Sequence, residues 1–152
     1  MTNELFRKLE TAKGISRVVA AAPAQQRSQA LLAMADELLA GTDEILAANR
    51  QDIGKAQRAG VEPKRIRILT ISQKDIFAMA DYFRLVATQA DPVGKLLEET
   101  EKDGMRREKR LFPLGVVAVV SEARPSVVTD CAALCLRAGN VLLFRGSSHS
   151  EG

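Results

Sequence analysis

The amino-acid sequence predicts an α/β fold composed of N-terminal helices, a β-hairpin and one β-α-β unit. Three observations support this prediction. Residues 116–120 and 141–144 are short, unbroken apolar runs, which is typical of strands in a parallel sheet. Apolar residues recur between these runs at helical spacing. Helical periodicity also dominates residues 1–90, and the Asp103-Gly104 dipeptide after them is a strong signal for a two-residue hairpin turn.

The N-terminal part, residues 1–90, is expected to contain helices whose apolar faces pack into a core. Their expected limits are a first helix from Thr2 to Ala22, a second from Pro23 to Gly41, a third from Thr42 through Ala56, and a fourth from Ser72 to Gln89. Residues 60–63 form a loop in this interpretation. The methionine and aromatic side chains of these helices are expected to be core residues.

Residues 91–112 are expected to form an exposed hairpin arm. The basic residues Arg106, Arg107, Lys109 and Arg110 leave open a nucleic-acid interface. The same hairpin carries five acidic residues, which favours cross-strand ion pairs on a solvated ribbon. The edges of such a ribbon need partners, so the arm could also mediate association.

Residues 113–152 are expected to form the β-α-β unit. The strand Val116 to Val120 is expected to be central and covered on both faces, and Pro125 suits the first turn of the helix that follows. That helix is expected to end at a Gly139-Asn140 cap. In a right-handed crossover, Arg124 and Arg145 lie on the edge where the helix N-terminus can bind an anion. The alternative is that both arginines are ordinary surface charges.

Composition limits the function classes. The 152 residues are 46% hydrophobic and 27% charged with a net charge of +3, which indicates one compact domain and does not require nucleic acid. No stretch of eighteen apolar residues and no secretory signal is seen, so we expect a cytoplasmic protein without membrane contact.

Few residues are candidates for thiol, metal or triad chemistry. Cys131 and Cys135 are expected to be core residues, because no further cysteine or histidine accompanies them as metal ligands. His149 is the single histidine and receives no role. We therefore predict neither a catalytic residue nor a metal site in this chain.

The stretch from Pro113 to Gly146, with its EARP turn, ALCL helix segment and GN cap, resembles γ-glutamyl phosphate reductase, a member of the aldehyde dehydrogenase superfamily. The resemblance continues upstream through MADELLAGTDEILAANRQDI and DPVGKLLEE, and so covers nearly the whole chain. It implies an incomplete aldehyde dehydrogenase-like fold, in which residues 1–90 are the helical segment of the cofactor domain. Residues 91–112 would then be the oligomerisation arm, and residues 113–152 the first β-α-β unit of a Rossmann-like NADP-binding domain.

The resemblance also implies site residues. Glu122, Arg124 and Ser126 would lie on the side of the substrate, γ-glutamyl phosphate. The cofactor NADPH would be bound by the residues that follow the second strand, which are Arg145, Gly146 and Ser147. The family usually has Tyr, Asn and Gly where this chain has Ser121, Ser126 and Ser147.

The implied reaction is the NADPH-dependent reduction of γ-glutamyl phosphate to glutamate-5-semialdehyde in proline biosynthesis. The catalytic cysteine of the family belongs to a later segment, so we expect the isolated chain to be inactive. The alternative is a non-catalytic homologue that acts only by associating, through the arm, with itself or with a full-length relative. The third alternative is a nucleic-acid-binding protein, which rests on the basic residues of the hairpin alone.

Overall fold

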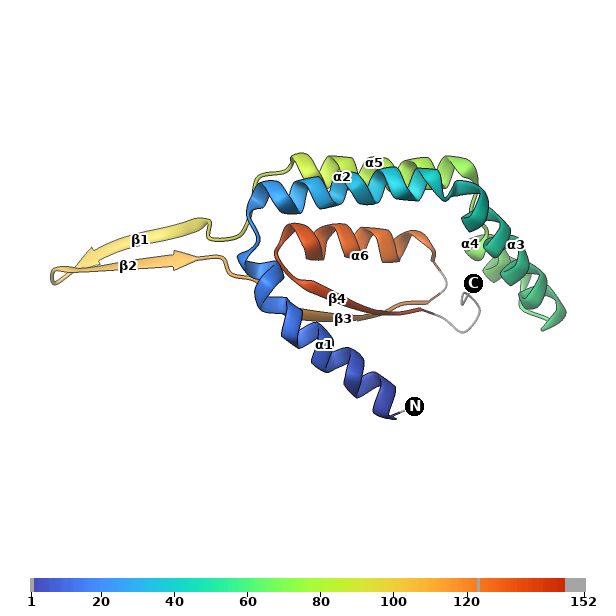
Figure 1. Ribbon diagram of the computed structural model, residues 1–152, viewed down its shortest axis with the longest axis horizontal. Coiled ribbons are helices and arrows are strands. Elements are labelled where there is room, and N and C mark those ends of the chain that lie inside the picture. The colour runs from blue at the N-terminus through green and yellow to red at the C-terminus, as the bar shows by residue number, and fades with distance from the viewer. Residues whose placement is uncertain (1, 123, 147–152) are drawn as a thin grey trace.

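The computed structural model describes residues 2–122 and 124–146, and it has the expected mixed α/β architecture (Figure 1). The helices are α1 (Thr2–Ala21), α2 (Ala24–Ala40), α3 (Thr42–Arg58), α4 (Pro63–Leu69), α5 (Gln73–Thr88) and α6 (Ser126–Arg137). The strands are β1 (Leu96–Lys102), β2 (Met105–Arg110), β3 (Val116–Val120) and β4 (Val141–Arg145). Within the described ranges, no helix combines the length and the apolar character that crossing a membrane requires.

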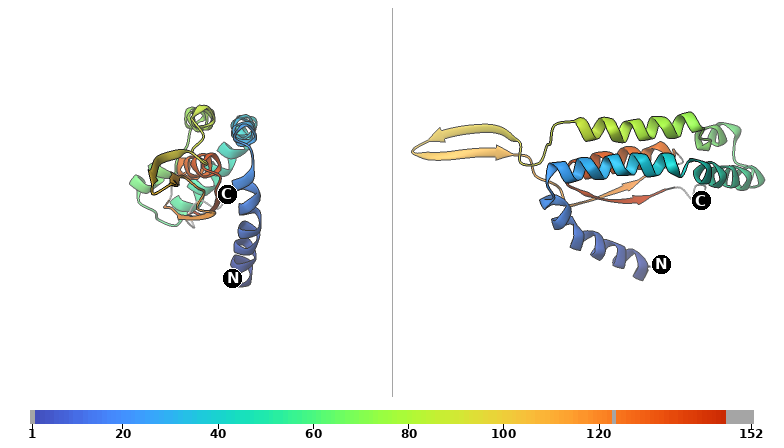
Figure 2. Two further views of the ribbon diagram at one scale, coloured as in Figure 1. Left: turned by 90° about the vertical axis from the view of Figure 1, so that its left-hand side faces the viewer. Right: turned by 45° about the horizontal axis from the view of Figure 1, so that its top comes forward.

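Helix α6 lies between two layers of the molecule. The paired helices α2 and α5 cover one side of it, and the strands β3 and β4 lie on the other (Figures 1 and 2). The buried cluster between the three helices is rich in alanine, which allows the helix axes to approach closely. Its members are Leu31, Ala35, Ala80, Phe83, Val86, Ala87 and Ala133. The core therefore joins the N-terminal helices to the β-α-β unit.

Helix α1 departs from the expectation that its apolar face is packed. Ala12 is buried, but Leu5, Ile15 and Val18 are 54%, 47% and 70% exposed. The helix contacts β4 and β3 through part of its length, and its N-terminal half extends beyond these two strands (Figure 1). Helical periodicity predicted the helix correctly, whereas its burial depends on what lies beside it.

Helix α4 occupies residues that the sequence did not mark as helical. Pro63 stands at its first turn, where a missing N–H is tolerated, and Leu69 at its end is buried. The side chain of Asn49 on α3 holds this end by donating to Leu69 O at 2.8 Å and accepting from Ile71 N at 3.1 Å. Seven residues are too few to show a periodicity, which explains why the pattern missed the helix.

Strands β1 and β2 form the expected antiparallel hairpin, which projects from the body (Figures 1 and 2). Asp103 and Gly104 both have positive φ angles, of 53° and 74°, as a two-residue turn of this type requires. Every residue of both strands is exposed. The hairpin is therefore a ribbon with two open edges.

One ion pair connects the two strands of the ribbon, as the sequence predicted, and two more lie within β2. Glu99 stands directly opposite Glu108, and the guanidinium of Arg106 contacts both carboxylates at 2.8 Å. Arg110 contacts Glu108 at 2.6 Å. Two of the four basic residues that suggested a nucleic-acid interface are thus neutralised within the hairpin.

Strands β3 and β4 are parallel and pair from Val116 with Val141 to Val120 with Arg145. The expectation that β3 is a central strand covered on both faces is wrong for the described part of the chain. Val120 is 73% exposed, and β3 pairs there with β4 alone. Continuous apolar sequence predicted the strand, but two strands leave an open edge that helices α1 and α6 do not cover.

Candidate ligand-binding site at the carboxyl edge of the strand pair

The parallel register brings the candidate residues of both strands to one edge. Val120 and Arg145 are opposite each other at the strand ends, and Ser121 N donates to Arg145 O at 3.1 Å. The loop from Ser121 to Pro125 and the residues after β4 therefore leave the sheet side by side. This juxtaposition was expected from the β-α-β topology.

The loop after β3 is tightly turned before α6 begins. Arg124 N donates to Glu122 O at 2.7 Å, and Val127 N donates to Arg124 O at 3.2 Å. Pro125 has φ −56° and ψ −37°, a helical conformation that suits the first turn, as predicted. The hydroxyl of Ser121 also donates to Glu122 O at 2.9 Å, so this side chain points back to the loop backbone.

The N-terminus of α6 has no side-chain cap and no acidic residue in its first turn. Val127 N in the first turn is bonded to Arg124 O, but the other N–H groups of this turn and the positive end of the helix dipole favour an anion. The hydroxyl of Thr129 donates to Ser126 O at 2.7 Å. The carboxyl of Asp130 lies one turn into the helix, where burial raises its pKa.

The charged candidates are exposed at this edge. Glu122, Arg124 and Arg145 all face solvent, and within the described residues none of their side chains forms an ion pair or hydrogen bond. Ser126 and Gly146 are half-buried. Ser147, Ala123 and His149 lie outside the described residues. Two unpaired guanidinium groups and an uncapped helix N-terminus form a surface suited to phosphate or carboxylate.

The two cysteines do not lie at this edge. Both are free and half-buried on α6, so their expected core position is only partly reached. Burial, and then the neighbouring Cys131, raises the pKa of the Cys135 thiol. A raised pKa lowers the thiolate fraction, which makes Cys135 a poor nucleophile. In the described ranges, no three His, Cys, Asp or Glu side chains gather as metal ligands.

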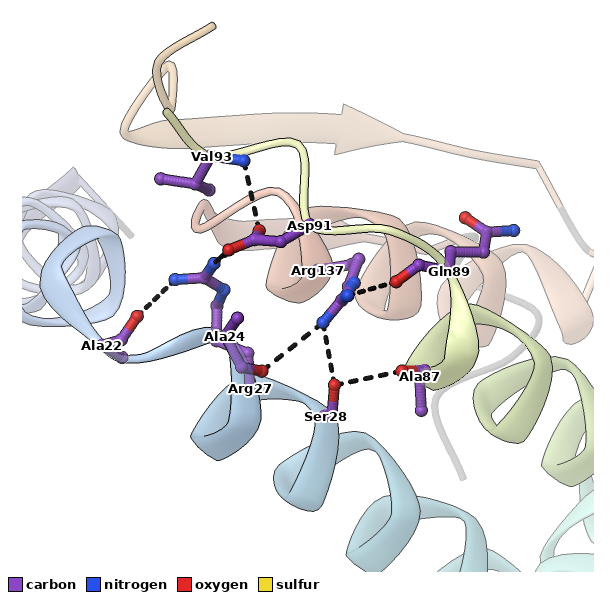
Figure 3. A network of polar contacts seen from close by, with 9 residues as sticks. All are labelled: Ala22, Ala24, Arg27, Ser28, Ala87, Gln89, Asp91, Val93 and Arg137. Atoms are coloured by element: carbon purple, nitrogen blue, oxygen red, sulfur yellow. Dashed lines mark hydrogen bonds and ion pairs between the residues drawn. The ribbon is translucent and has the colours of Figure 1, made fainter. Parts of the chain in front are cut away.

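Sequence reasoning missed a polar network at the opposite end of α6, near the hairpin (Figure 3). Arg27 of α2 and Arg137 of α6 are 2% and 7% exposed, and both lie near Asp91. Arginine is mostly exposed in proteins, and it is buried almost only where it is paired. The positions of Arg27 and Arg137 in the sequence therefore gave no sign that these side chains are buried. The long-range partner, Asp91, is separated from Arg27 by sixty-four residues in sequence.

Asp91 is held in its ionised form by these neighbours. Burial alone would raise the pKa of its carboxyl, but hydrogen bonds from Val93 N and Arg27 and the charge of Arg137 outweigh burial and lower it. The network is therefore cationic overall, because it holds two guanidinium groups and one carboxylate.

A pocket of about 690 Å³ lies elsewhere, at the corner between α1 and α2. It is lined mostly by small apolar side chains such as Val18, Ala22 and Ala30, with Arg17 and Arg27 among its few polar residues. It does not include the residues of the strand edge. This pocket is therefore separate from the candidate residues.

The fold and the edge define a class: a mixed α/β chain with a parallel β-α-β unit whose anion-suited loops leave the same sheet edge. Comparison with known proteins narrows this class. The chain is 40% identical over 151 residues to a γ-glutamyl phosphate reductase from Bradyrhizobium sp. (strain ORS 278), covering 99% of this chain and 34% of the relative. It is 42% identical over 138 residues to one from Chloroflexus aggregans, covering 90% of this chain and 33% of the relative.

Solved structures agree with the sequence comparison. The γ-glutamyl phosphate reductase of Thermotoga maritima matches with a TM-score of 0.92 and 30% identity over 97% of this chain and 36% of that protein. The Saccharomyces cerevisiae protein matches with a TM-score of 0.83 and 28% identity over 93% of this chain and 36% of that protein. No family model matches the chain.

The chain is therefore a homologue of γ-glutamyl phosphate reductase that corresponds to an N-terminal-like segment. It spans about a third of the length of the relatives it matches. The resemblance inferred from the EARP turn is confirmed at this level.

Proposed function

We propose that the chain is the N-terminal part of an NADPH-dependent oxidoreductase that reduces γ-glutamyl phosphate to glutamate-5-semialdehyde in proline biosynthesis, in the cytoplasm. The homology to the reductases supports the reaction class. The observation that carries the site is the pairing of Val120 with Arg145, which puts the loops after β3 and β4 at one edge. In this proposal residues 1–90 and 113–152 belong to the cofactor domain, and residues 91–112 form the arm.

The cofactor side would be Arg145, Gly146 and Ser147. The guanidinium of Arg145 is exposed at the end of β4 without a partner among the described residues, so it fits the 2′-phosphate that distinguishes NADPH. Gly146 leaves room for close approach of the backbone to a ligand. When bound, NADPH would supply the hydride.

The substrate side would be Glu122, Arg124 and Ser126. Arg124 and the uncapped N-terminus of α6 would attract the anionic acyl phosphate, and the hydroxyl of Ser126 would donate to it. Glu122 would repel a ligand that approached with its negative groups in the wrong orientation. These residues bind and orient the substrate, and none of them is assigned a chemical step.

Binding of adenosine 2′,5′-bisphosphate tests the cofactor side without requiring turnover. Calorimetric titration should show tighter binding of this probe than of 5′-AMP, and Arg145→Gln should remove the difference. Arg124→Gln is the matched control, because it removes a neighbouring guanidinium on the substrate side. Equal binding of the two probes by the unmodified chain would contradict the assignment.

The isolated 152-residue polypeptide is proposed to be catalytically inactive. The pKa of Cys135 is raised, and both cysteines are half-buried on α6 and not at the edge where the ligands are proposed to bind. We expect no change in NADPH absorbance with NADP, phosphate and glutamate-5-semialdehyde at any enzyme concentration. Turnover that persists in the Cys131→Ala and Cys135→Ala variants would point to a contaminating enzyme, whereas turnover lost in them would refute the proposal.

The second candidate function is association through the arm without catalysis. The specific observation is the ribbon itself, because both strands are exposed along their whole length and their outer edges are unpaired among the described residues. Sedimentation velocity over a wide concentration range should show a dimer or larger species. A monomer at every concentration would remove self-association.

A further inference from the structure

The arm leaves the body through two chain segments that are tied to each other. Gly94 N donates to Leu111 O at 2.9 Å, and Leu111 N donates to Lys95 O at 3.0 Å. Arg110 of β2 also donates to Gly94 O at 2.9 Å. We call the two segments that connect the ribbon to the body, residues 93–95 and 111–113, the roots of the arm. These bonds make the ribbon and its roots one unit, but they do not set the direction of the arm relative to the helices.

Asp91 connects this unit to helix α2. The guanidinium of Arg27 donates to both carboxylate oxygens, at 2.6 and 2.7 Å, and also to Ala22 O, directly after α1 (Figure 3). The same carboxylate accepts from Val93 N at 3.1 Å, which fixes the first residues of the root. One carboxylate thus joins α2 to the start of the arm.

Arg137 closes the network from the side of α6. Its guanidinium donates to Ser28 Oγ at 2.8 Å and to Gln89 O, just before Asp91 in the chain (Figure 3). Ser28 in turn donates to Ala87 O at 3.0 Å. Both arginines are at least nine-tenths buried, and their Nε atoms have no partner among the described residues.

Gly139 provides a second, uncharged contact at the same place. A Cβ at this position would lie 2.9 Å from Pro113 Cγ and 3.3 Å from Val93 Cγ2, which belong to the two root segments. Its φ of 72° also favours glycine. The end of α6 therefore packs directly against both roots.

We propose that the buried network of Arg27, Asp91 and Arg137 is a lock that fixes the direction of the β1–β2 arm relative to the helical body. Arg27 is paired with Asp91, and the charge of Arg137 acts on the same carboxylate from nearby. Loss of the Asp91 charge therefore leaves buried cations that move toward solvent or other acceptors. The three residues do not belong to the arm's exposed strands. They are positioning residues, and any effect on association passes through the direction of the arm.

Spin-label distances test the lock directly. In a Cys131→Ala, Cys135→Ala background, labels at Thr100→Cys on the arm and Gln25→Cys on α2 report the arm's direction by pulsed electron spin resonance. We expect one narrow distance distribution in the parent and a broadened, shifted distribution in Asp91→Asn. Asp81→Asn is the matched control, because it removes an exposed carboxylate that pairs with Arg84, and its distribution should equal the parent's.

A second pair of labels, Gln25→Cys and Lys74→Cys, reports the body alone and should stay narrow in both variants. If Asp91→Asn disrupts the body, the double variant Arg27→Met with Asp91→Leu removes both charges together and should fold with a mobile arm. An arm distribution as narrow in Asp91→Asn as in the parent, or as narrow in the double variant, would overturn the lock.

The consequence for association rests on the second function proposed above. If the chain self-associates, Asp91→Asn should weaken association although Asp91 is not on the ribbon. If the parent is monomeric, the proposed self-association is wrong, but the distance measurement still tests whether the network fixes the direction of the arm.

Discussion

Two charge networks in this molecule use the same residue types and differ in burial. In the ribbon, Arg106 bridges Glu99 and Glu108, and Arg110 pairs with Glu108, on a surface where all four residues are exposed. At the start of the arm, Arg27 pairs with Asp91 and Arg137 lies nearby, and both arginines are almost fully buried. Water and salt weaken the first network but reach the second poorly. We therefore expect the burial of a network, more than its number of ion pairs, to determine how much it contributes to the free energy of unfolding.

The largest difference is expected on removing one carboxylate from the buried network. Asp91→Asn should lower the free energy of unfolding by about 3 kcal/mol, because Arg27 is left buried without a counter-charge. We take the lower end of the usual range since the side chain of Asp91 is 27% exposed. Urea unfolding followed by circular dichroism measures the change. A loss no greater than that of Asp81→Asn would contradict the contrast between the two networks.

A smaller loss is expected from a neutral member of the buried network. Ser28→Ala removes the acceptor for Arg137 at 2.8 Å and the donor to Ala87 O at 3.0 Å. The expected cost is about 1 kcal/mol, because Arg137 keeps the backbone acceptors Gln89 O and Ala24 O. Ser16→Ala is the control, since among the described residues the Ser16 hydroxyl bonds only to Lys13 O within its own helix. Equal unfolding midpoints for the two variants would show that Arg137 does not need Ser28.

Acid should weaken the buried network in a defined pH window. The folded-state pKa of Asp91 lies below its ordinary value of 3.8, so the stabilisation is present above that value and is lost as pH falls through the folded pKa. Glu4, Asp75 and Glu108 also have lowered pKa values and contribute to the same acid loss. The test is therefore the difference between parent and Asp91→Asn: the gap in unfolding free energy should narrow below pH 3.8. If the difference in unfolding free energy between the parent and Asp91→Asn stayed constant as the pH falls, the charge of Asp91 would not be its source.

The smallest effect is expected in the ribbon. Glu108→Gln removes the acceptor shared by Arg106 and Arg110. Both arginines keep much of their side chains in solvent, 63% for Arg106 and 40% for Arg110, whereas Arg27 keeps 2%. The global unfolding midpoint should therefore not change measurably at low or at high salt. Chemical shifts of the arm at low salt should change, which would show that the ribbon responds locally. A midpoint shift comparable to that of Asp91→Asn would invalidate the comparison.

Patterns within short stretches predicted most local structure correctly. Apolar runs located β3 and β4, the Asp103-Gly104 dipeptide located the hairpin, and Ser72 begins α5 with a capping box to Asp75. The Gly139-Asn140 cap is also confirmed, by the positive φ of Gly139 and the bond from Asn140 N to Cys135 O at 2.8 Å. Each of these signals depends on neighbours in sequence.

The candidate site could be predicted in part. The parallel crossover was enough to place Arg124 and Arg145 at one edge, and the pairing of Val120 with Arg145 confirms that placement. The ligand roles of these residues, and of Glu122, Ser126, Gly146 and Ser147, remain predictions. Side-chain roles depend on a bound ligand, which neither a pattern nor a backbone arrangement specifies.

By itself the sequence determined the element types, the turn chemistry and the homology to γ-glutamyl phosphate reductase, because propensity, capping and motif are local properties of the chain. Only the tertiary structure decided which apolar faces are buried and where the arginines go. The face of α1 that reads as core is mostly exposed, whereas Arg27, which reads as surface, is buried against Asp91. Burial depends on neighbours that are distant in sequence. These neighbours therefore also determine how much an apolar or charged residue contributes to stability.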